Sequence, residues 1–172
     1  MFRKLMVIFL GFMAMTTQAY ELTKDEAQIA LTVQSMGTLA DRNQYDVLEK
    51  IFTPEVVVDY TSAFGGEVST IQRSVLMTNW AGLLPGFDAT YHDLNNIKVV
   101  EQKGNKAKAT ADIVASHYIG EEGYWQISGS YSYELEKTGD TWQISSLTLH
   151  AGEEQGTRDV LGLAIEAAKK KN

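Results

Sequence analysis

Apolar residues recur at helical spacing in the first half of this chain and alternate with polar ones in the second half. Between residues 23 and 40 they fall every three or four positions, which predicts a helix with one apolar stripe. A second, short helix is expected from about residue 43 to 52, because Pro54 disfavours helical backbone just before it. The stripe of the first helix consists of Ile29, Val33, Met36 and Ala40.

β-branched residues follow from Glu55 to Tyr60 and predict a strand. Ser69 and Gln72 have the spacing of a capping box, so a third helix is expected to begin there and to end around residues 84–86. Alternating apolar and polar positions then predict four long strands, over residues 88–101, 105–119, 122–137 and 140–150.

The turns between the long strands are short and rich in glycine, which predicts antiparallel neighbours. The alternation slips phase at residues 95–96 and again at 145–146, and such slips indicate β-bulges that bend a sheet. We therefore expect an α+β fold: a cone-shaped α+β barrel in which a curved, mostly antiparallel sheet wraps around the N-terminal helices. Residues 153–172 are expected to form an extra C-terminal helix packed on the domain. Our hypothesis is that it covers the mouth of the cone as a lid; the alternatives are packing on the sheet, exchange with a neighbouring molecule or a frayed surface helix.

Two histidines and two tyrosines are expected to face the interior of this cone. His117 shares the parity of the alanines on its strand, and His92 is in phase with Leu94. Tyr131 and Tyr133 share the apolar parity of the third long strand. Each has a structural alternative, namely a core histidine held by a carbonyl or a tyrosine packed as a large hydrophobe.

Gly129, between Ile127 and Tyr131, leaves space for a ligand in this interior. Tyr60 shares the parity of Val56 and Val58, and the pattern leaves open which side of that strand is buried. Asp41 follows the first helix at the edge of its apolar stripe, where the alternative is a local cap or turn residue.

The N-terminal sequence and the composition indicate the compartment of the protein and limit its possible partners. Arg3 and Lys4 precede an apolar run, and Thr17-Gln18-Ala19 offers small residues for cleavage, so residues 1–19 are expected to be a secretory signal peptide. The protein is then exported, to the periplasm or to the medium, and residues 20–152 form one domain. The net charge of −7 disfavours nucleic acid and anionic membrane surfaces as partners. The chain has no cysteine and three histidines without metal-binding spacing, so neither a metal nor a cofactor is expected.

Several segments, in this order, resemble SnoaL-like members of the nuclear transport factor 2-like superfamily. The resemblance spans about residues 23–150, and its pattern is similar to that of scytalone dehydratase-like proteins. The segments that carry it are 40–46, 56–60, 86–92, 115–117, 129–131 and 142–144.

This resemblance implies roles for four residues. Asp41 matches the orienting carboxylate, His117 the histidine that it orients, His92 a second histidine, and Tyr60 a tyrosine that helps to hold a water. The sequence departs from the dehydratase pattern at Ala40, where that family has a tyrosine, and at Gly129 and Tyr131, where it has serine and asparagine. These changes make the expected pocket more apolar.

Three functions remain open at this point. The first is a dehydratase or isomerase without cofactor, in which Asp41 and His117 transfer a proton on a small apolar or carbonyl-bearing molecule. The second is an exported carrier or sensor of an apolar ligand. The third is an assembly module, and a homo-oligomer, dimer or trimer, is expected in any case. The wall residues expected around the ligand are Tyr131, Trp80, Trp125, Phe87 and Met77.

Overall fold

The computed structural model describes residues 21–171, so the expected signal peptide lies outside the described residues. Within them, no helix is long and apolar enough to cross a membrane. The helical elements are α1 (Lys24–Asp41), α2 (Tyr45–Leu48), α3 (Thr61–Phe64), α4 (Arg73–Ala81) and α5 (Asp159–Lys171), with short 3-10 turns at Glu49–Ile51, Leu84–Gly86 and Gly120–Glu122. The strands are β1 (Phe52–Asp59), β2 (Ser69–Gln72), β3 (Ala89–Lys103), β4 (Lys106–Ile119), β5 (Gly123–Thr138) and β6 (Thr141–Gly156).

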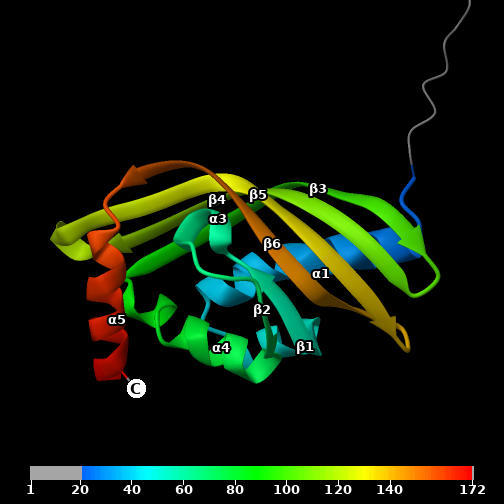
Figure 1. Ribbon diagram of the computed structural model, residues 1–172, viewed down its shortest axis with the longest axis horizontal. Coiled ribbons are helices and arrows are strands. Elements are labelled where there is room, and N and C mark those ends of the chain that lie inside the picture. Colours follow the sequence, from blue (N-terminus) through cyan, green and yellow to red (C-terminus); the bar gives the residue numbers. More distant parts are fainter. Residues whose placement is uncertain (1–20, 172) are drawn as a thin grey trace, which may run out of the picture.

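The six strands form one curved, open sheet in the order β2-β1-β6-β5-β4-β3. All neighbours are antiparallel except β1 and β6, which run parallel. The long strands arch over α1, and α4 lies below them with β1 and β2 (Figure 1). The expected α+β class and the curved, mostly antiparallel sheet are confirmed.

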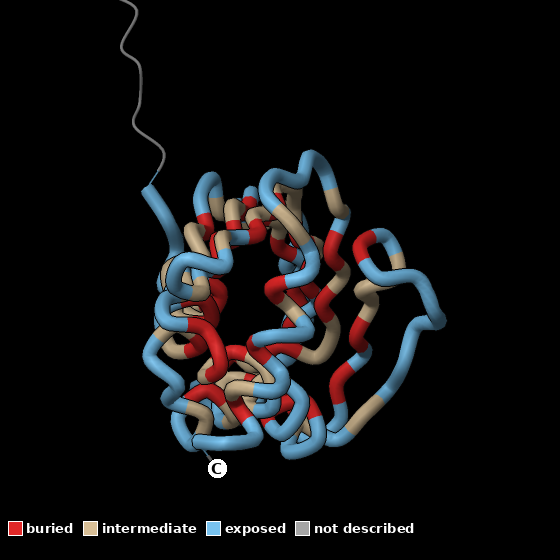
Figure 2. Tube along the Cα trace, turned by 90° about the vertical axis from the view of Figure 1, so that its left-hand side faces the viewer, coloured by how far each residue is buried: buried red, intermediate tan, exposed pale blue. Residues whose placement is uncertain are grey.

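Both predicted bulges are present. The pairing of β3 with β4 shifts register between Asn95 and Lys98, and the pairing of β5 with β6 shifts at Glu134/Leu135, where Ser145 is the extra residue. These irregularities bend the long strands around the helices. Along the long strands β4 and β5, buried residues alternate with more exposed ones (Figure 2), as expected for a sheet with one face turned to the interior.

The predicted start of the third helix is wrong. Residues 69–72 form β2, which pairs antiparallel with β1 between Glu55/Gln72 and Val58/Ser69, and α4 begins only at Arg73. Backbone N–H and C=O groups of these residues form hydrogen bonds with β1, in place of the capping hydrogen bonds that a helix start would have required. The last strand is also longer than expected, because β6 continues to Gly156.

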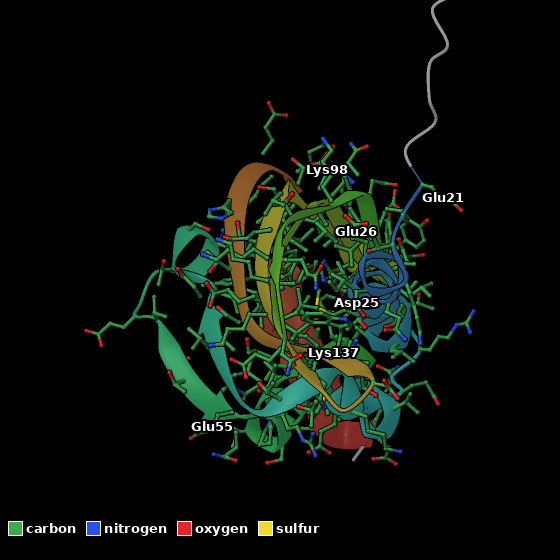
Figure 3. The ribbon with its side chains drawn as sticks, turned by 90° about the vertical axis from the view of Figure 1, so that its right-hand side faces the viewer. Glu21, Asp25, Glu26, Glu55, Lys98 and Lys137 are labelled. Carbon is green, nitrogen blue, oxygen red and sulfur yellow. The ribbon has the colours of Figure 1, made fainter. Side chains whose placement is uncertain are left out.

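The sheet and α1 are joined at one end by an ion pair, which Figure 3 shows from that side. Lys137 Nζ of β5 lies 2.7 Å from Asp25 Oδ1 in the first turn of α1 and 5.8 Å from the ring centroid of Trp142. The capping box of α1 pairs Thr23 with Glu26 at the same end. These contacts hold the start of α1 against the sheet.

Helix α5 docks on the 3-10 turn Leu84–Gly86 through fully buried Val160, Ala164 and Ala168. The approach is close, since a Cβ on Gly86 would lie 1.8 Å from the Ala164 carbonyl oxygen. Among the described residues, α5 contributes none to the wall of the cavity described below, which differs from the expected lid.

Gly86→Ala is expected to lower the free energy of unfolding by about 2 kcal/mol, because the new methyl group overlaps the backbone of α5. Gly162→Ala is the matched control: it lies exposed in α5 with no atom near its added Cβ, and helix propensity predicts a gain of up to about 1 kcal/mol. Urea unfolding measures both. A Gly86→Ala variant as stable as the native chain would show that α5 does not dock here.

Candidate active site

A cavity of about 350 Å³ lies between the sheet and helices α1 and α4. Its wall is mostly apolar, and no lysine, arginine, aspartate or glutamate of residues 21–171 lines it. Five aromatic side chains line it together with two histidines, His92 and His117: Tyr60, Phe64, Trp80, Trp125 and Tyr131. Such a wall suits a neutral ligand with a large apolar surface.

The carboxylate of Asp41 is held against His92 beside this cavity. His92 Nδ1 lies 2.6 Å from Asp41 Oδ1, and the His92 backbone N–H donates to Asp41 Oδ2 at 2.9 Å. The hydroxyl of Thr90 donates to Oδ1 as well, at 2.8 Å. Because a carboxylate can only accept these bonds, the contact assigns the proton of the neutral ring to Nδ1 and leaves Nε2 as the acceptor.

Gly37 explains why α1 can place Asp41 at this point. A Cβ on Gly37 would lie 2.6 Å from the His92 carbonyl oxygen, so only glycine lets α1 pass so close to β3. Asp41 follows one helical turn later, on the same face of α1. Its side chain therefore reaches the start of β3, where Thr90 and His92 point to the same side of the sheet.

Two opposing effects act on the pKa of Asp41. Partial burial raises it, but the hydrogen bonds from the His92 side chain and backbone, and the one from Thr90, together outweigh burial. The pKa of Asp41 is consequently held below its usual value, and the group stays ionised at neutral pH. A fixed anion at Nδ1 would also stabilise the imidazolium that forms when Nε2 accepts a proton.

His117 has a different environment, because its ring is packed between other rings. Phe87 and Trp125 lie on it with centroids 5.0 Å away, and His92 meets it edge-on at 5.2 Å. Its Nδ1 lies 3.4 Å from the Trp125 carbonyl oxygen. Burial, reinforced by the charge of nearby His92, lowers the pKa of His117 to about 4. His117 is thus neutral at physiological pH.

The cavity tyrosines are hydrogen-bond donors rather than bases. Burial raises the pKa of Tyr131 to about 12, and burial together with neighbouring Tyr131 raises the pKa of Tyr60 well above its usual value. Their rings meet at 6.5 Å in an edge-to-face arrangement. Both therefore keep their protons at neutral pH and can donate to an oxygen of a ligand.

The structure brings most of the predicted site residues to this cavity but pairs them differently. Asp41 contacts His92, so the expected Asp41–His117 hydrogen bond is replaced by an Asp41–His92 one. The cause is that α1 lies against β3: three donors of Thr90 and His92 reach the carboxylate, whereas His117 lies one strand further on, on β4, opposite Thr90. Tyr60, Tyr131, Trp80 and Trp125 line the cavity.

Phe87 and Met77, expected as wall residues, are buried but do not line the cavity. Phe87 packs against the ring of His117 instead. Met77 is buried in the hydrophobic core, on α4.

Sequence reasoning missed Thr90, Asn79 of α4, Phe64 and Arg158. The first two are polar side chains on predicted elements, and the phase of Thr90 with His92 was the one signal that could have singled it out. Phe64 lies on α3, a four-residue helix that the apolar pattern did not predict.

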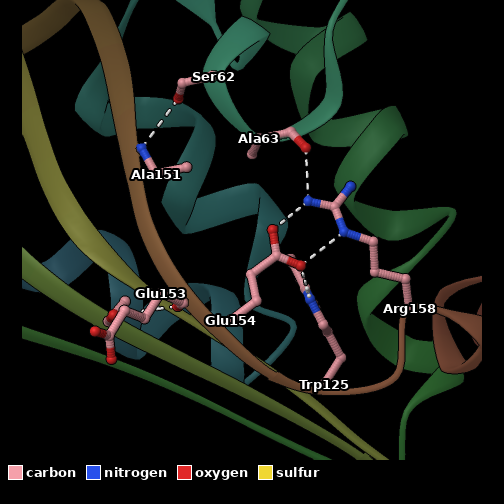
Figure 4. Close-up of polar contacts among 8 residues, drawn as sticks. Ser62, Ala63, Trp125, Ala151, Glu153, Glu154 and Arg158 are labelled. Atoms are coloured by element: carbon pink, nitrogen blue, oxygen red, sulfur yellow. Dashed lines mark hydrogen bonds and ion pairs between the residues drawn. The ribbon is translucent and has the colours of Figure 1, made fainter.

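Arg158 holds the outer aromatic wall of the cavity in place (Figure 4). Its guanidinium lies 5.4 Å from the ring centroid of Phe64 and 5.8 Å from that of Trp125, and it donates to the Ala63 carbonyl at 2.7 Å. Glu154 accepts both from Arg158 and from the indole N–H of Trp125, at 2.7 and 2.9 Å. Residues near the C-terminus thereby fix α3 and Trp125 against each other.

Comparisons with known proteins place this chain by sequence and by fold. The family model described as a SnoaL-like domain matches residues 21–148, which confirms the resemblance found from the sequence. The remainder of β6 and α5 lie beyond this match. No curated protein matches the chain.

Solved structures with a similar fold come from several bacteria. The Kfla4162 protein from Kribbella flavida superposes with a TM-score of 0.70 and 23% identity, over 80% of this chain and 95% of that one. A proposed scytalone dehydratase from Novosphingobium aromaticivorans superposes with a TM-score of 0.66 and 19% identity, over 75% of this chain and 85% of that one. Hexachlorocyclohexane dehydrochlorinase LinA-type3 from Novosphingobium barchaimii superposes with a TM-score of 0.62 and 16% identity, over 77% of this chain and 89% of that one. At these identities the likeness establishes the fold alone.

Proposed function

Because this chain belongs to the SnoaL-like domain family, we propose that it is an enzyme that removes a proton from a neutral, largely apolar substrate and so catalyses an elimination or isomerisation. The observation that carries this proposal is the 2.6 Å contact between Asp41 Oδ1 and His92 Nδ1 at the wall of an apolar cavity. A carboxylate that fixes the tautomer of a histidine leaves its other nitrogen as a general base. The neighbours described as a dehydratase and a dehydrochlorinase support an elimination.

His92 Nε2 takes the proton from a carbon next to a carbonyl group, and the electrons of that C–H bond form an enolate. A phenol of Tyr60 or Tyr131 donates to the enolate oxygen, since both tyrosines keep their protons. When the enolate collapses, its electrons form a carbon–carbon double bond and expel a β-hydroxyl group. That group takes the proton from the His92 imidazolium and leaves as water. Return of the proton to another carbon would give an isomerisation instead.

A panel of neutral cyclic β-hydroxy ketones tests this function. We expect the native chain to convert at least one of them to its enone, followed by the absorbance of the product. His92→Gln is expected to reduce this rate by at least a hundredfold, because glutamine keeps a polar side chain at the wall but supplies no base. An unchanged rate in His92→Gln, or no turnover by the native chain across the panel, would contradict the proposal.

The size and the apolar wall of the cavity favour a second function, that of a carrier or sensor of a small apolar ligand. In that case His92→Gln would retain ligand affinity, and no substrate of the panel would be turned over. Export directed by residues 1–19 and assembly into a homo-oligomer, dimer or trimer, remain proposals for either function.

A further inference from the structure

The carboxylate of Asp41 accepts from a donor outside the Asp41–His92 pair, and this donor is the hydroxyl of Thr90. The distance from Thr90 Oγ1 to Asp41 Oδ1 is 2.8 Å, and the same oxygen accepts a hydrogen bond from His92 Nδ1. The other carboxylate oxygen accepts from the His92 backbone. All three donors come from one short stretch of β3, so the carboxylate is held across the gap between α1 and β3.

Thr90 belongs to the part of β3 that faces the carboxylate of Asp41. It lies two residues before His92, so both side chains point to the same side of the sheet. It also pairs directly with His117 of β4. The hydroxyl at this place donates to the carboxylate, whereas Nδ1 of His117 lies 3.4 Å from the Trp125 carbonyl oxygen.

We propose that Thr90 is a positioning residue, which fixes the rotation of the Asp41 carboxylate and through it the tautomer of His92. This inference deepens the proposed function, on which it rests for its catalytic meaning. Two bonds to Oδ1 and one to Oδ2 leave the carboxylate a single orientation, and in it His92 carries its proton on Nδ1. Without the hydroxyl, the carboxylate loses one of these donors and can rotate away from the ring.

Thr90→Val removes the hydroxyl while keeping the shape and β-branching of the side chain, and Thr90→Ser restores the hydroxyl in a smaller side chain. The measurement is the NMR titration of the Asp41 carboxyl carbon together with the ¹⁵N shifts of the His92 ring. In Thr90→Val we expect the pKa of Asp41 to rise by about one unit and the fraction of Nε2-protonated His92 to increase. Thr90→Ser is expected to give native values for both.

Native carboxyl titration and native ring shifts in Thr90→Val would overturn the inference. So would a Thr90→Ser variant that behaves like Thr90→Val, since the effect would then come from packing. Amide spectra check that each variant is folded, and Thr90→Ala is the substitute if valine prevents folding, with the same expected shifts.

The NMR result does not depend on turnover, so its outcome and that of the substrate panel are independent. If the panel yields a substrate, Thr90→Val is expected to lower kcat about tenfold with little change in KM, because Thr90 does not line the cavity. A change confined to KM would contradict a positioning role. Altered NMR shifts without any turnover would retain the positioning and reject the enzyme.

Discussion

Replacing Asp41 by asparagine is expected to lower kcat of the proposed reaction about a thousandfold, with the fold retained. Asparagine has the same shape, but it cannot act as an anion opposite the Nδ1 proton of His92. Its amide can instead donate to Nδ1, which favours the tautomer with the proton on Nε2. His92 then has no lone pair directed at the substrate, and the imidazolium loses its counterion.

Steady-state kinetics on the substrate identified by the panel measure this effect. Asp112→Asn is the matched control, because Asp112 is an exposed strand residue whose carboxylate accepts from Asn96, away from the cavity. The control is expected to keep the native kcat. Activity above one-tenth of the native value in Asp41→Asn would mean that Asp41 does not orient the base.

The second large effect is a loss of stability in mild acid caused by His117. The folded protein holds the pKa of His117 at about 4, whereas an unfolded histidine has its usual value of 6.5. Between these values the unfolded chain binds a proton that the folded chain does not. The contribution of His117 is therefore fully present above pH 6.5, falls as the pH is lowered, and levels off below about pH 4.

The difference between the two pKa values corresponds to a loss of about 3 kcal/mol across this range. Urea unfolding at a series of pH values measures it in the native chain and in His117→Gln, whose amide can still donate to the Trp125 carbonyl but does not titrate. The native chain is expected to lose about 3 kcal/mol more than this variant. Comparison with the variant removes the contribution of Asp41, whose lowered pKa acts at lower pH.

His150→Gln serves as the control, because His150 lies exposed on the outer face of the sheet beside Ser132. This variant is expected to retain the pH dependence of the native chain. If His117→Gln loses as much stability in acid as the native chain, His117 is not the neutral, buried group described here.

The pattern along the sequence predicted the long elements and the direction of their side chains. Side chains alternate strictly between the two faces of a strand, so the apolar parity was enough to direct His92, His117 and Tyr131 inward. The same alternation revealed the bulges near Asn95 and Ser145, because an extra residue shifts its phase. These features depend on neighbouring residues only.

Short elements were beyond the reach of this pattern. Helix α3 has four residues and β2 has four, too few for a periodicity to be recognised, and both depend on contacts with other strands, α3 with β6 and β2 with β1. Phe64 and Arg158, which shape the outer wall of the cavity, are brought together over a long stretch of chain. The pattern of the sequence therefore could not predict that these two residues lie beside each other.

By itself, the sequence predicted that a curved sheet would enclose two histidines and several aromatic rings, and it placed an acid at the end of the first helix. Only the tertiary structure decided that Asp41 meets His92 and not His117. That choice depends on how closely α1 passes β3 at Gly37 and on the register that sets Thr90 opposite His117. The first arises from the packing of segments about fifty residues apart along the chain and the second from the pairing of β3 with β4, and a local pattern determines neither.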